Sequence, residues 1–167
     1  NLNDFPFPEN KGGTFEIAAR VTGGVLDYAN GWPKMENIDG DLKVHGRRMD
    51  VIARDASILG AKLARVRAEI PDLGNPERIL AVSGEAEGPT SEFLKFIEQS
   101  PVIDLVDRFT ARVQAEGRGK LTLKLTLPIN NAKDTKVEGV FQFINNQIQN
   151  AGDLFPYEQV NARLEFT

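Results

Sequence analysis

The chain has 167 residues, 41% of them hydrophobic and 26% charged, and its net charge at pH 7 is −4. This length and composition are typical of a folded domain with an apolar core, so disorder is not expected. The 20 Lys and Arg residues are scattered, which argues against a nucleic-acid partner and against direct docking on anionic lipid headgroups. The absence of cysteine excludes disulfides and thiolate metal sites, and no apolar run reaches the roughly 18 residues of a membrane-spanning helix.

Apolar and polar residues alternate through residues 15–89, which predicts β-strands with one wet face. The predicted inward side chains of the first two strands are Phe15, Ile17, Val21, Ile38, Leu42 and Val44. Further runs at 49–53, 64–70 and 80–86 continue the pattern, with Ala64 assigned to the same face as Val66. Gly23-Gly24 is interpreted as a turn between runs.

The period changes to 3.6 residues between Thr90 and Phe109, which predicts two short amphipathic helices inserted at about 90–109. Thr90 is predicted to cap the first helix, and Ser100-Pro101 to end it and begin the second. The predicted apolar faces of these helices comprise Phe93, Phe96, Ile97, Leu105 and Phe109. They are expected to pack on the open face of the sheet or, alternatively, to plug or line an apolar channel.

Strands resume after the helices. The clearest one contains the inward residues Leu121, Leu123 and Leu125, and Gly117-Arg118-Gly119 before it predicts a bulge or bend. The later inward residues are Phe141, Phe143, Leu164 and Phe166, with Asn145-Asn146 interpreted as a turn between them. Gly and Asn punctuation at this spacing is typical of an antiparallel meander.

The end of the chain resembles its beginning. Val137 follows Phe15 by 122 residues, Phe166 follows Val44 by the same interval, and Phe155-Pro156 follows Trp32-Pro33 by 123. A fixed period indicates a repeat array in which each unit stacks on the next. We therefore predict a mainly β protein, an elongated antiparallel β-groove or curved sheet. Its expected parts are a linker or the end of a preceding unit at 1–13, one repeat unit at 14–129, and the start of the next unit at 130–167.

Residue types that carry catalysis or bind metals are sparse. The single histidine, His45, falls on the polar side of its strand and is expected to face solvent. Asp39 and Asp41 flank Gly40 without the third acidic ligand or closing Glu of a calcium loop. The sequence thus predicts no enzyme, no metal site and no cofactor.

A long ordered series of segments resembles a known family. The series begins with GWPKMENIDGDLKVHG at 31–46, continues through Ile70-Pro71-Asp72-Leu73 and Ser83-Gly84-Glu85, and reaches Phe96-Ile97 and Ser100-Pro101. It is similar to the central region of YhdP-type members of the AsmA-like family, to which TamB is related. The resemblance covers residues 13–129 well.

The resemblance implies an inner-membrane-anchored protein of a Gram-negative bacterium, with a β-rich body that crosses the periplasm. Its expected partners are phospholipid acyl chains, bound in an apolar groove, and neighbouring repeats of the same chain. Membrane contact would be made only through parts of the parent protein outside this sequence. The alternative is a non-catalytic structural or interaction module of a large cell-envelope protein.

Overall fold

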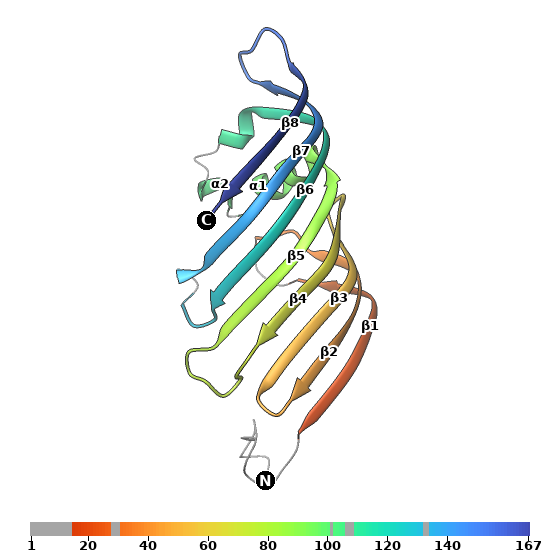
Figure 1. The fold of residues 1–167 in the computed structure, drawn as a ribbon, viewed down its shortest axis with the longest axis vertical. Helices are drawn as coiled ribbons and strands as arrows, with labels where there is room; N and C mark the ends of the chain where they lie inside the picture. Colours follow the sequence, from red (N-terminus) through yellow and green to blue (C-terminus); the bar gives the residue numbers. More distant parts are fainter. Residues whose placement is uncertain (1–14, 28–30, 101, 106–108, 132–133) are drawn as a thin grey trace.

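The computed structural model describes residues 15–27, 31–100, 102–105, 109–131 and 134–167. Eight strands form one antiparallel sheet in the order β1-β2-β3-β4-β5-β6-β7-β8 (Figure 1). The strand bounds are β1 Glu16–Leu26, β2 Met35–His45, β3 Arg48–Ile58, β4 Ala61–Ile70, β5 Ile79–Pro89, β6 Val113–Pro128, β7 Lys136–Asn150 and β8 Tyr157–Phe166. The predicted meander is confirmed, and the sheet is open, with β1 and β8 as its two edges.

One helix stands out from the sheet. Helix α1 (Thr90–Glu98) lies between β5 and β6 in the chain, followed by the single turn α2 (Val102–Leu105) and the 3₁₀ turn η2 (Phe109–Arg112). The prediction of two amphipathic helices is therefore wrong for the second, which is one turn long within the described residues. The predicted cap is also wrong: Thr90 is the first helical residue, and its buried hydroxyl has no hydrogen-bond partner.

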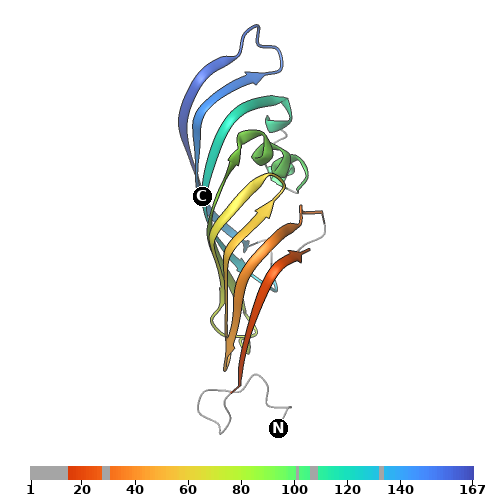
Figure 2. The ribbon, with the colours of Figure 1, turned by 90° about the vertical axis from the view of Figure 1, so that its right-hand side faces the viewer.

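Positive backbone φ angles recur inside the strands and mark β-bulges. They occur at Gly23 in β1, Asn37 in β2, Arg65 in β4, Gly117 in β6, Asn145 in β7 and Gln159 in β8. Register shifts accompany them in the pairing of β1 with β2, of β4 with β5 and of β7 with β8. A bulge bends its strand and increases the local twist, which accounts for the bowed sheet in Figure 2.

The bulges overturn two interpretations made from turn chemistry. Gly23-Gly24 and Asn145-Asn146 are not turns, because they lie within β1 and β7. A bulge also changes which residues share a face. Ala64 pairs with Asp55 and Glu85, on the polar side of the sheet, because the bulge at Arg65 separates it from Val66. The predicted bulge at 117–119 is confirmed by the register shift between Glu116 and Arg118.

The β7–β8 hairpin repeats the geometry of the β1–β2 hairpin. Val21 faces Gly40 in the first hairpin, and Phe143 faces Ala162 in the second, so both partners are displaced by 122 residues. The bulge recurs at the same interval, since Gly24 pairs with Ile38 and Asn146 with Val160.

A side chain closes the bulge in each hairpin. The Gly23 backbone N–H donates to Asp39 Oδ1 at 2.9 Å, and the Asn145 N–H donates to Asn161 Oδ1 at 3.0 Å. These are equivalent positions, so one local device shapes both hairpins. The expected linker at 1–13 lies outside the described residues, and the partition into units at 129 stays a prediction. The sheet itself is continuous there, because β6 pairs with β7 along most of its length.

Replacing Asp39 by Ala should destabilise the chain, because the Gly23 N–H at the bulge loses its acceptor. We expect the free energy of unfolding, measured by urea denaturation, to fall by about 0.5–1 kcal/mol. The matched control is Asp39→Asn, which retains a side-chain carbonyl as Asn161 does in the second hairpin. Equal losses in the two variants would contradict this role for the acceptor.

Candidate functional site

The register of the sheet gathers its apolar side chains on one side, which we call the apolar face. Leu121 stands between Ala86 of β5 and Phe141 of β7, and Leu125 between Val82 and Val137. Followed strand by strand through the paired positions, the apolar face includes Ile17, Ala19, Val21, Ile38, Leu42, Val44, Met49, Val51, Ala53, Val66, Ala68, Ile70, Leu80, Val82, Ala86, Leu121, Leu123, Leu125, Val137, Phe141, Phe143, Ala162, Leu164 and Phe166.

The structure brings the predicted inward residues together on this face. Twelve of the thirteen lie within strands at the positions just given. The remaining one, Phe15, precedes β1, and its carbonyl accepts a hydrogen bond from the Gly46 N–H at 2.8 Å. Their role in binding a ligand stays a prediction.

Burial is uneven across the apolar face. Val44 and Phe141 are only 7% and 9% exposed, whereas Val21 near one edge and Leu164 near the other are 40% and 54% exposed. A sealed domain of this size would bury large aliphatic side chains throughout its core. Here the fully buried apolar residues include four alanines, at 53, 56, 61 and 115. The centre of the sheet is covered, and the edges leave large apolar side chains in contact with water.

Helix α1 supplies the cover. It lies against β5 and β6, on the concave side of the bowed sheet (Figure 2). The ring of Phe93 meets Phe141 of β7 edge-on at 5.0 Å between centroids, and Phe141 meets Phe143 in the same way at 4.7 Å. Gly119 of β6 lies directly beneath, because a Cβ there would stand 3.2 Å from the Phe93 ring.

A second aromatic residue of α1, Phe96, contacts a distant part of the sheet. The ring of Phe96 lies 5.8 Å from that of Trp32, in the connection between β1 and β2. Helix α1 therefore links β7 to the β1–β2 hairpin across the concave side. Of the remaining helix residues predicted to be apolar contacts, Ile97 is half-buried, whereas the side chains of Leu105 and Phe109 lie outside the described part of the chain.

A carboxylate holds α1 to the turn between β3 and β4. Glu92 Oε2 accepts a hydrogen bond from the Gly60 N–H at 3.1 Å, and Lys95 Nζ lies 2.6 Å from Glu92 Oε1. The Lys95 ammonium, followed by the Gly60 N–H, lowers the pKa of Glu92 below its usual value. Gly60 has no room for a side chain, since a Cβ would stand 2.7 Å from Glu92 Cγ.

The opposite face of the sheet is lined with paired charges. Asp41 accepts hydrogen bonds from Arg20 and Arg54, which lower its pKa. Arg48 pairs with Asp50 of its own strand β3 at 2.8 Å and with Glu69 of the neighbouring strand β4 at 2.6 Å. Such exposed pairs contribute little stability individually. Their consequence is a solvated outer face, which leaves the concave side as the apolar one.

The described residues offer little for catalysis or metal binding. They contain no group of three or more His, Cys, Asp or Glu side chains that could hold a metal ion. His45 is exposed, as predicted, and Asp39 is engaged in closing the bulge beside Gly23. Neither helix of the described chain is long and apolar enough to cross a bilayer.

The middle strands contribute Met49, Val51, Ile70 and Val82 to the apolar face, as the alternation at 49–53, 64–70 and 80–86 predicts, although the sequence does not mark them as residues that line the groove. The contact of Trp32 with α1 is not predicted from the sequence, which indicates Trp32 only as part of the repeat. Nothing local to it signals a contact with a helix some 60 residues later in the chain.

The fold and its surface define a class of protein: an open antiparallel β-sheet with one apolar, concave side and one charged side. The family model described as YhdP protein matches residues 1–167, and the chain belongs to this family. A curated relative, the intermembrane phospholipid transporter YhdP of Escherichia coli (strain K12), is 22% identical over 144 residues. The match covers 86% of this chain and 11% of the relative, so the chain spans about a tenth of its length.

Family membership confirms the resemblance found in the sequence. No solved structure matches the chain significantly.

Replacing Gly119 by Ala should destabilise the chain, because the added methyl group collides with the rings of Phe141 and Phe93. We expect a loss of about 1–3 kcal/mol in the free energy of unfolding, as is typical when a packed site is overfilled. The control is Thr122→Val on the outward side of the same strand, with a change within about 0.5 kcal/mol. A neutral Gly119→Ala variant would show that α1 does not rest on β6 in solution.

Acid should release α1 from the turn at Gly60. Because the pKa of Glu92 is lower in the folded chain, its stabilising effect is complete above the ordinary value of 4.5 and is lost as the pH falls through the lowered value. The fluorescence of Trp32, the single tryptophan, reports the contact with Phe96. In Glu92→Gln, which cannot ionise, we expect a weaker response between pH 7 and 3. An unchanged acid response in this variant would contradict the prediction.

Proposed function

We propose that this chain is a segment of an inner-membrane-anchored periplasmic protein, and that its apolar face forms a groove for phospholipid acyl chains moving between the inner and outer membranes. The observation that carries the proposal is the continuous apolar face, which extends over all eight strands of an open sheet. The printed name of the curated relative supports phospholipid as the cargo.

The energetics of lipid transfer require such a surface. Exposing an acyl chain of roughly sixteen carbons to water costs on the order of 12 kcal/mol, at about 0.8 kcal/mol per methylene. A polar surface offsets none of this cost, whereas an apolar face replaces water along the whole chain. The exposed fractions of Ile17 (41%), Val21 (40%) and Leu164 (54%) indicate apolar area still available for contact.

Helix α1 leaves most of the face uncovered. Its contact with the sheet centres on Gly119 and Phe141. Leu125 is six positions further along β6, about 20 Å away at the rise of a β-strand, and it stands among Val82 and Val137 on the adjacent strands. We place the acyl chain along this part of the face and the polar headgroup in solvent at its border.

The two edge strands of the sheet would allow the apolar groove to continue into neighbouring units. Strands β1 and β8 each have one side without a partner in the described chain, and such edges favour pairing with a further strand. Neighbouring units of the parent protein would pair there and continue the apolar face. This arrangement makes the groove of one unit part of a longer conduit.

The test places a photo-crosslinking amino acid at Leu123, on the apolar face, in the full-length parent protein in cells. The matched control is the adjacent Lys124, whose side chain belongs to the charged face. We expect phospholipid adducts, identified by mass spectrometry, at Leu123 and a strongly reduced yield at Lys124. Equal yields at the two positions, or none at Leu123 and Phe141, would instead favour the structural or interaction module.

A further inference from the structure

The two equivalent hairpins differ in the burial of the aromatic residue that each carries between its strands. In the first, Trp32 follows β1 and is half-buried against Phe96 of α1. In the second, the corresponding residue is Phe155, between β7 and β8, and it is 79% exposed. Pro33 and Pro156 follow the two aromatic residues, so the local sequence is also shared.

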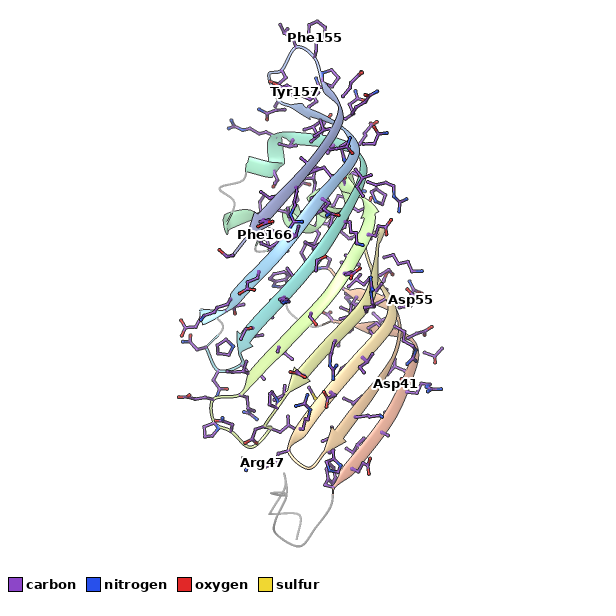
Figure 3. The ribbon with its side chains drawn as sticks, viewed as in Figure 1. Asp41, Arg47, Asp55, Phe155, Tyr157 and Phe166 are labelled. Atoms are coloured by element: carbon purple, nitrogen blue, oxygen red, sulfur yellow. The ribbon has the colours of Figure 1, made fainter. Side chains whose placement is uncertain are left out.

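The exposed ring does not stand alone. Its neighbours Leu154 and Tyr157 are 89% and 64% exposed, which makes the end of this hairpin the most exposed apolar site among the described residues. Figure 3 shows Phe155 and Tyr157 at the tip of the β7–β8 hairpin, away from the body of the sheet. Apolar clusters of this kind usually mark a surface that a partner covers.

Helix α1 itself does not reach this tip. Its two aromatic rings are engaged elsewhere, Phe93 with Phe141 and Phe96 with Trp32. Because the hairpins are equivalent at an interval of 122 residues, we expect a second helix like α1 to follow the β7–β8 hairpin. If the spacing of 122 residues continues, its first residue would stand roughly 45 residues beyond Thr167. The chain covers 11% of its curated relative, so the parent protein has ample length to contribute this helix.

We propose that Phe155 is the docking site of a second amphipathic helix, with aromatic residues one turn apart as in α1, contributed by the following unit of the parent protein. The helix would rest on Phe155 as Phe96 rests on Trp32. Each hairpin of the β1–β2 type would then hold the helix of its own unit, so that helices cross the concave side at regular intervals. This inference rests on the internal equivalence of the hairpins and does not depend on the lipid function.

The test lengthens the chain and follows an indole at the docking site. Because Thr167 is equivalent to His45, a second copy of residues 46–150, which includes the strands equivalent to β6 and β7 that support α1, is appended after Thr167. Phe155→Trp is introduced together with Trp32→Phe, which leaves a single indole in the protein. Its emission and its quenching by acrylamide are compared in the original and the lengthened chain.

We expect the indole to shift to the blue in the lengthened chain and its quenching constant to fall roughly twofold, because an exposed ring becomes half-buried. The control carries the same extension with the appended copies of Phe93 and Phe96 replaced by Ser, and should match the original chain. The proposal is overturned if the indole stays as quenchable as in the original chain. Equal protection in the Ser control also overturns it, because the added strands rather than the helix would then cover the ring.

Discussion

The structure depends on keeping apolar side chains on one side of a sheet that bends sharply. Strict alternation would suffice in a flat strand, because successive side chains point to opposite faces. Bending requires bulges, and each bulge adds one residue that would reverse the alternation. The sequence compensates at each of these positions. In β2 the apolar positions change from Met35 to Ile38 across Asn37, and in β4 from Leu63 to Val66 across Arg65.

Polar groups stabilise these bulges locally. The acceptors Asp39 and Asn161 meet the backbone N–H groups that the bulges remove from the strand ladder. Asn146, fully buried, donates through its side-chain amide to the carbonyl of Arg118 across the β6–β7 pair. These contacts satisfy buried or unpaired backbone groups, which would otherwise be costly. The curvature of the sheet is thus encoded by a few polar residues and glycines.

The two faces of the sheet meet different requirements. Ion pairs such as Arg65 with Glu85 cover the convex side and keep it in water. The concave side is covered where α1 lies, through the rings of Phe93 and Phe96 and the contact of the Glu92 carboxylate with Gly60. An apolar surface that is partly covered and partly open is unusual for an isolated domain. It is the arrangement that the proposed lipid groove, continued into neighbouring units, would require.

The sequence by itself determined the strands, the meander and the residues of the apolar face, because a period of two residues survives in every strand between bulges. It also predicted that the β7–β8 hairpin matches the β1–β2 hairpin, since equivalent positions need the same residue types. It did not distinguish bulges from turns at Gly23 or Asn145, because Gly and Asn favour positive φ in either setting. Only the tertiary structure decided that the second predicted helix is a single turn and that α1 reaches Trp32. Both depend on contacts between residues far apart in the chain, which no local pattern records.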